Sequence, residues 1–411
     1  MKIGFTVLFL VLLPSMAFSK IETRGFVTLG TAASNSDVSY QNHIGKLPTV
    51  TGITKFGLNL SSDISDRWSF SGQLLSTGQQ DYYDLRTDWI ILRYQPLTNL
   101  RFNIGKQLVP LWFAAEYIDV GFLLPWVVPP EEIYNIANIK AFSGLSMNYT
   151  YELGSLNLEL QPFYGAVNDE LPAVYAPDGL STKVEAERVY GVSIDLGNEF
   201  MEARMAYVYG HTNVDYPPGI LIEDFETEIT TFGLKYDRGD FLLWAEYGVI
   251  KDVSSQSSVD KRKEEALAAI TRAAPYGENP DLNDVQQLND VTDAFTKTII
   301  ANRVTGYSTY YLTLGYRIDD FVPTISFANL AKIKDEDLIT GGEQSSSTLG
   351  LRYFVSATSD FKLEYQTISV PKGSYGLFDA TNYYIASLTP GAELEELGDV
   401  NIFKFAFNAV L

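Results

Sequence analysis

The most informative chemical feature of the sequence is a set of basic side chains, each at a polar position of a segment in which apolar and polar residues alternate. Residues two apart in an extended strand lie on the same face, so each such cation stands on the polar face of a strand whose other face is apolar. Cations held this way can attract ions and polar solutes, and rings of charge tune ion preference. The set comprises Lys55, Arg101, Arg204, Lys235, Arg317, Arg352, Lys362 and Lys404.

A second set of charges lies in one unusual stretch, residues 109–140. The stretch is rich in apolar and aromatic residues, and its carboxylates are Glu116, Asp119, Glu131 and Glu132. Its four prolines, at positions 110, 125, 129 and 130, are incompatible with a continuous helix, and each would remove a hydrogen bond from a strand. We therefore expect a long loop that folds inward into a cavity wide enough to hold it.

Residues for covalent or metal chemistry are scarce. The sequence has two histidines, His43 and His211, and no cysteine. A metal site or a Ser–His pair would depend on one of these lone histidines, and no phosphate-binding glycine loop or calcium-loop spacing occurs. The sequence therefore predicts no enzyme, no metal and no cofactor.

Charge and composition limit the class of partner. The chain of 411 residues has a formal net charge of −21, which argues against nucleic acid. Residues 1–19 resemble a signal peptide, because Lys2 precedes a short apolar run and Ala17-Phe18-Ser19 forms a small-residue cleavage pattern. An exported chain without disulfides must be stabilised by another large, closed structure.

The elements that position the charges are strands, because alternation of period two recurs far more often than helical period. About 16 segments qualify, each near the length of a tilted membrane strand. We predict strands at 22–33, 52–62, 67–77, 84–95, 99–108, 141–152, 155–166, 186–196, 200–211, 227–236, 240–251, 306–318, 321–332, 346–355, 361–370 and 399–411.

The connections alternate between short turns and long loops, with both chain ends on the short-turn side. This order is typical of an outer-membrane barrel. Backbone groups in lipid must all be paired, so the strands must close. We predict an all-β fold: an antiparallel transmembrane β-barrel of about 16 strands spanning residues 20–411, with 109–140 inside the lumen. The long loop 252–305 is expected to hold two short amphipathic helices separated by Pro275 and Pro280.

The final strand resembles the C-terminal strand of Gram-negative porins. Phe403, Phe405 and Phe407 alternate with Lys404, Ala406 and Asn408 up to the last residue, Leu411, where the porin family usually has Phe. The stretch 109–140 is similar to the third external loop of that family, which narrows the pore. The resemblance implies an outer-membrane location in a Gram-negative bacterium, contact with outer-membrane lipid, and a homotrimer. The second loop, 78–83, is shorter than the loop by which porins latch onto a neighbouring subunit.

These features predict passive diffusion of small hydrophilic solutes or ions through a water-filled channel. If the basic wall residues oppose the loop carboxylates, a transverse field crosses the constriction and orients polar solutes. Arg101 is the leading candidate for selectivity, because its strand leads directly into the loop. Two alternatives stay open: a substrate-selective uptake channel of the same fold, and a surface adhesin or structural barrel. The acidic residues expected on the wall are Glu159, Asp195, Glu202 and Glu364.

Overall fold

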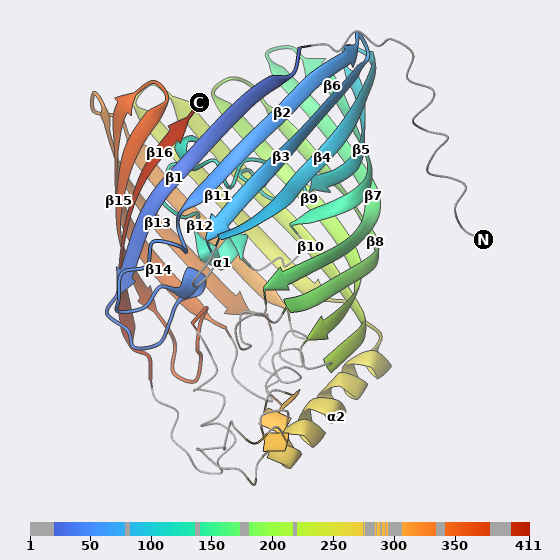
Figure 1. Ribbon diagram of the computed structural model, residues 1–411, viewed down its shortest axis with the longest axis vertical. Coiled ribbons are helices and arrows are strands. Elements are labelled where there is room, and N and C mark those ends of the chain that lie inside the picture. Colours follow the sequence, from blue (N-terminus) through green and yellow to red (C-terminus); the bar gives the residue numbers. More distant parts are fainter. Residues whose placement is uncertain are drawn as a thin grey trace, which may run out of the picture.

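The chain forms a closed antiparallel barrel of 16 strands, in which each strand pairs with its neighbours in sequence and β1 closes against β16 (Figure 1). The computed structural model describes residues 20–78, 83–135, 140–172, 181–216, 220–273, 275, 284, 286–287, 290–291, 293–294, 306–333, 342–378 and 396–411, with only the backbone described for 169–172, 181–184, 214–216 and 220–224. The predicted barrel and strand number are confirmed.

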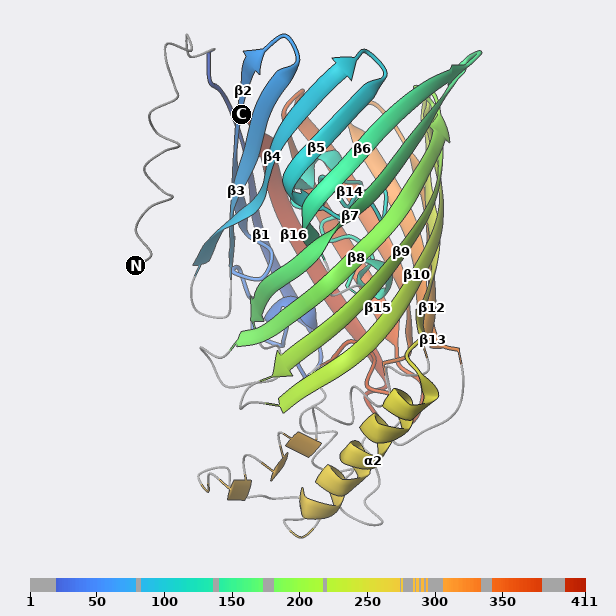
Figure 2. The ribbon, with the colours of Figure 1, turned by 90° about the vertical axis from the view of Figure 1, so that its right-hand side faces the viewer.

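The strands follow the predicted order with local differences in length. They are β1 Glu22–Ser34, β2 Lys55–Ser65, β3 Trp68–Gly78, β4 Tyr83–Leu97, β5 Leu100–Leu108, β6 Ala141–Leu153, β7 Leu156–Pro172, β8 Ser181–Gly197, β9 Met201–Tyr216, β10 Ile220–Arg238, β11 Phe241–Asp252, β12 Tyr307–Tyr316, β13 Phe321–Lys332, β14 Gln344–Ser356, β15 Ser359–Ser369 and β16 Asp399–Val410. Short turns and the C-terminus lie at one end of the barrel, and α2 (Gln256–Ala273) lies beyond the other end (Figures 1 and 2).

The two faces of each strand differ as the alternation predicts. In β6, Leu145 is 49% exposed on the outer surface, whereas Ser146 is 1% exposed inside the barrel. In β16, Phe403 and Phe405 point outward and Lys404 is buried inside. A barrel with an apolar exterior and a polar interior is the arrangement that a bilayer requires.

Four strands on one side extend further than the sequence indicated. The predicted loops 167–185 and 212–226 are largely strand, because β7 to β10 are 17, 17, 16 and 19 residues long. The register shifts between Gly165 and Val167, Ala186 and Arg188, and Ile222 and Phe225. Each such bulge changes which face the next residue occupies, so the alternation breaks although the strand continues.

A bulge also explains why the sequence does not show which residues of 89–92 point outward, since all four of them are apolar. The register between β3 and β4 shifts between Gln73 and Leu74. Beyond the shift Ile90 is exposed on the outer surface, and Arg93 pairs with the inward-facing Asn103.

The long loop after β11 begins with helix α2, which is 18 residues long. Helix α2 buries Val259, Ala266 and Ala269, and its buried Arg262 forms an ion pair with Asp252 at 2.6 Å. The predicted second helix of 252–305 lies mostly outside the described residues, as do the predicted signal peptide 1–19 and most of the second loop. Within the described chain, no helix is both long and apolar enough to cross a bilayer.

The main hydrophobic core lies inside the barrel and is built on the loop between β5 and β6. Leu111, Trp112, Phe113 and Trp126 of this loop are each at most 4% exposed and pack with inward-facing residues of the wall. Residues 109–140 are called the inward loop below. The apolar side chains of this irregular stretch are therefore buried in the barrel interior.

Candidate functional site

The inward loop crosses the lumen and docks on one half of the barrel wall. It leaves β5 at Val109, whose amide donates to the carbonyl of Lys140 at 3.0 Å. It contains the 3-10 turn η2 (Gly121–Leu123) and the single-turn helix α1 (Glu131–Tyr134), which is visible inside the barrel in Figure 1. Most of its hydrogen bonds reach β9 to β16, and Asp119 and Lys140 connect it to β2 and β4 on the other side of the barrel.

Buried cations of the wall hold carbonyl groups of the loop. The Nζ of Lys362 donates to the backbone oxygens of Gly121 and Leu124, each at 2.5 Å, and of Trp126 at 3.2 Å. Lys362 is 2% exposed. Further along the wall, Arg352 donates to the carbonyl of Phe122 at 2.6 Å. Irregular backbone has no ladder partners, so buried carbonyls need such donors.

Buried carboxylates of the wall hold amide groups of the loop. Glu246 accepts hydrogen bonds from the amide of Phe113 at 2.8 Å and from the hydroxyls of Tyr134 at 2.6 Å and Tyr311 at 2.8 Å. Glu364 accepts from the amide of Val127 at 2.8 Å. The wall therefore satisfies both the donors and the acceptors of the loop backbone.

Aromatic packing completes the docking. The ring of Trp126 lies 5.2 Å from Trp244 and 5.3 Å from Tyr311, edge to face in both pairs, and its indole nitrogen donates to Thr313 at 2.9 Å. Trp112 lies against Gly248 so closely that a Cβ there would meet the indole at 2.3 Å. The missing side chain at this position makes room for the ring.

Asp119 of the loop is fully paired. It forms ion pairs with Lys55 of β2 at 2.9 Å and with Lys140, which also pairs with Asp88 at 3.0 Å. Burial alone would raise the pKa of Asp119, but the two lysines outweigh it and hold that pKa well below its usual range. Asp119 therefore ties the loop to the wall instead of presenting a free charge.

Glu131 and Glu132 are buried at the start of α1. Glu131 accepts from Asn42 at 3.2 Å and lies 3.7 Å from Lys404, while Glu132 accepts from Gln344 at 2.8 Å. Burial raises the pKa of Glu131 to about 7, although Lys404 acts in the opposite direction. Both carboxylates belong to the interface between loop and wall.

Glu116 is the predicted loop carboxylate that is exposed in the passage. The carboxylate of Glu116 interacts electrostatically with Arg93 of β4 and, on the opposite side, with Glu202 and Arg204. Arg93 also experiences the like charge of Arg101 on β5. Arg93 and Arg101 are half-buried, and their strand partners Asn103 and Asn148 face the lumen. The Nε of Arg101 makes no hydrogen bond within the described chain.

The predicted basic residues divide into different roles. Arg204, Arg352, Lys362 and Lys404 contact the inward loop, and Arg204 does so through the carbonyl of Trp112 at 2.8 Å while pairing with Asp195 at 2.5 Å. Lys235 lies over the ring of Trp244 at 4.4 Å. Arg317 follows the end of β12 and pairs with Asp237 at 2.6 Å near a short turn, away from the inward loop.

Sequence reasoning missed three residues of this arrangement: Arg93, Asp88 and Glu246 as a binding group for the loop. Arg93 and Asp88 flank the segment whose faces were obscured by the bulge in β4. The available signal for Glu246 was a single carboxylate in an otherwise apolar strand, because such a group needs several donors when it is buried.

Comparison of the structure with known proteins identifies the fold. The outer membrane channel DcaP of Acinetobacter baumannii matches with a TM-score of 0.52 and 12% sequence identity, over 97% of this chain and 99% of that chain. OmpF of Salmonella typhi, solved with daunomycin, matches with a TM-score of 0.52 and 11% identity, over 95% of this chain and 98% of that chain. No protein-family model and no curated protein matches the sequence. The chain thus has the fold of Gram-negative outer-membrane porins.

Proposed function

We propose that this protein is an outer-membrane porin through which small hydrophilic solutes and ions diffuse passively. The observation that carries the proposal is the exposed carboxylate of Glu116 in the part of the lumen that the inward loop leaves open, with Arg93 and Arg101 on the wall that faces the loop. Charges of opposite sign on two sides of a narrow passage produce a field across it, and strands hold that field in place.

The docking contacts support a fixed constriction. Wall residues on β2, β9 and β11 to β16 bind the loop through hydrogen bonds or ion pairs, so the passage keeps its width without a solute. A docked loop with an adjoining polar wall favours diffusion over catalysis, and the proposal includes no enzyme activity and no cofactor. The residues assigned to selectivity are Glu116, Arg93 and Arg101.

The proposed location is the outer membrane of a Gram-negative bacterium, after removal of residues 1–19. The apolar exterior would contact outer-membrane lipid, and a homotrimer is the proposed assembly. DcaP, whose structure matches this fold, is an outer membrane channel, which supports the location. A substrate-selective channel is the second candidate, and it is developed in the next subsection.

Planar-bilayer recording tests the proposal. Purified protein should give stepwise conductance, and Arg101→Glu should shift the reversal potential in a salt gradient toward cation preference. Glu116→Gln should shift it toward anion preference. Gln161→Ala, which changes an uncharged side chain on the lumen face of β7, serves as the control. Absence of conductance contradicts channel function, and unchanged reversal potentials in both charge variants contradict the assignment of selectivity.

A further inference from the structure

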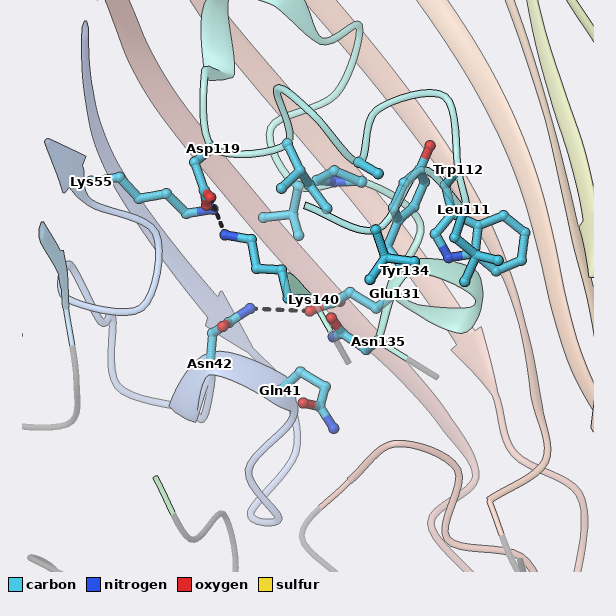
Figure 3. Close-up of a pocket in the computed structure, with 15 residues that line it drawn as sticks. Gln41, Asn42, Lys55, Leu111, Trp112, Asp119, Glu131, Tyr134, Asn135 and Lys140 are labelled. Atoms are coloured by element: carbon cyan, nitrogen blue, oxygen red, sulfur yellow. Dashed lines mark hydrogen bonds and ion pairs between the residues drawn. The ribbon is translucent and has the colours of Figure 1, made fainter. Parts of the chain in front are cut away.

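A cavity of about 350 Å³ lies between the inward loop and the first external segment of the chain (Figure 3). Its lining includes Gln41 and Asn42 from the segment between β1 and β2, and Trp112, Tyr134 and Asn135 from the inward loop. The volume is at the lower end of the range of small-molecule sites. The cavity lies on the long-loop side of the constriction, where a solute entering from that side would meet it.

One side of the cavity is apolar and aromatic. Leu111 and Trp112 belong to the packed core of the loop, and the ring of Tyr134 is half-buried beside them (Figure 3). The hydroxyl of Tyr134 is already used, because it donates to Glu246 at 2.6 Å. The aromatic side therefore offers a flat ring surface without a free polar group, which suits the C–H face of a solute ring.

The other side carries amides with unused hydrogen-bonding capacity. Asn42 donates to Glu131 at 3.2 Å and Gln41 donates to the carbonyl of Leu377 at 3.0 Å, so one end of each amide is committed and the other is available. The side chain of Asn135 is exposed and makes no hydrogen bond to any described residue. Amides of this kind both donate and accept, as hydroxyl groups do.

The charges around the cavity are balanced. Lys55 pairs with Asp119 at 2.9 Å, Lys140 pairs with Asp119 and with Asp88 at 3.0 Å, and Glu131 lies 3.7 Å from Lys404. An ionic solute would have to replace one of these existing pairs and leave its partner uncompensated, which is costly in a buried site. A neutral solute faces no such cost.

The segment over the cavity is held in an unusual conformation. Asn42 and His43 have positive φ angles of 58° and 57°. Gly52 lies directly beneath, where a Cβ would meet the carbonyl oxygen of Asn42 at 2.1 Å. Residues kept in this left-handed region cluster at ligand sites, because the surrounding structure must impose the strain.

We propose that this cavity is a binding subsite for a neutral, polyhydroxylated solute of about the size of a monosaccharide or disaccharide. The ring of the solute packs on Tyr134, and its hydroxyl groups bond to the amides of Asn42, Gln41 and Asn135. The inference rests on the proposed channel function and narrows it to a channel with a preference for sugar-like solutes.

Calorimetry on the detergent-solubilised full chain, with glucose and sucrose as probes, tests the subsite independently of conductance. We expect saturable binding of at least one sugar. Asn135→Ala removes one of the three amides, and Asn42→Gly removes a second while keeping the positive φ that glycine adopts freely. Each should weaken binding by about fivefold, the usual effect of one hydrogen bond. Gln161→Ala, outside the cavity, should bind as the unaltered protein does.

Three results would overturn the inference: no saturable binding of either sugar, full affinity in both amide variants, or binding of acetate or glycine in preference to the sugars. Single-channel recording in the presence of the same sugars separates this outcome from failure of the channel function. A protein that conducts but binds no sugar retains the proposed function and loses the subsite. A protein that binds sugar but does not conduct loses the channel function.

Discussion

Replacing Lys362 by methionine should release the central part of the inward loop from the barrel wall. Methionine has nearly the same length but no charge and no donor, so three buried carbonyls lose their shared partner. Asp360, which lies 3.9 Å from Lys362, keeps its shorter ion pair with Arg352 at 2.6 Å. The perturbation is therefore directed mainly at the loop.

The size of the effect follows from the contacts. A hydrogen bond to a charged group contributes roughly 1.5–3 kcal/mol. Counting only the two bonds at 2.5 Å, to Gly121 and Leu124, and taking the lower value gives about 3 kcal/mol. A change of about 3 kcal/mol moves the docking equilibrium of this segment roughly a hundredfold toward the open form.

Hydrogen exchange measured by mass spectrometry detects this opening directly. Amide protection over residues 121–127 should fall by up to about a hundredfold, and single-channel conductance should rise and become noisier. Protection near Phe113, which Glu246 and not Lys362 holds, should change little. Lys235→Met, a wall lysine that lies over Trp244, is the matched control. Unchanged protection and unchanged conductance in Lys362→Met would refute the view that this side chain anchors the loop.

Three further predictions concern the same docking interface. Because burial raises the pKa of Glu131 to about 7, the folded state favours its protonated form; the stabilisation is complete below about pH 4.3 and is lost as the pH rises through 7. Exchange protection of 131–135 should therefore fall by a factor equivalent to about 2–4 kcal/mol between pH 4 and 8, and Glu131→Gln should flatten this profile while Glu116→Gln retains it. Gly248→Val places a side chain where the indole of Trp112 lies, so thermal scans should show destabilisation by about 1–3 kcal/mol, whereas Gly154→Ala, in an open turn with positive φ, should show a smaller loss from backbone strain alone. Glu246→Leu leaves the amide of Phe113 and two tyrosine hydroxyls without their acceptor, and conductance should rise; a conductance equal to that of the unaltered protein would show that the carboxylate is dispensable.

The barrel is predictable from sequence because its rules are local. Alternation of period two and the order of short and long connections depend on neighbouring residues alone, and both can be recognised without knowing which residues pair across strands. The same rules failed where a bulge shifted the phase, as at Ala186 and Arg188 in β8. The predicted loop there is partly strand, in which the inward-facing and outward-facing positions change places at the bulge.

The inward location of residues 109–140 was also predictable, because prolines exclude regular structure and apolar side chains exclude water. The partners of the individual charges were not. Asp119 and Glu116 are three residues apart, yet one is paired with two lysines and the other is exposed. The difference depends on Lys55 and Lys140, which are distant from each other in sequence and meet only when the barrel has closed.

This distinction changes how the charge of the channel should be interpreted. A transverse field was expected from four loop carboxylates and eight wall cations, but most of these groups are engaged in the docking interface or paired with other charges. Five of the eight cations contact the loop itself, and Asp119, Glu131 and Glu132 bind groups of the wall or its margin. On the proposed function, the field across the passage depends on few residues, chiefly Glu116, Arg93 and Arg101. Because so few unpaired charges act on a passing solute, substitution of any one of them should alter ion preference strongly, whereas the net charge of −21 on the whole chain should matter little.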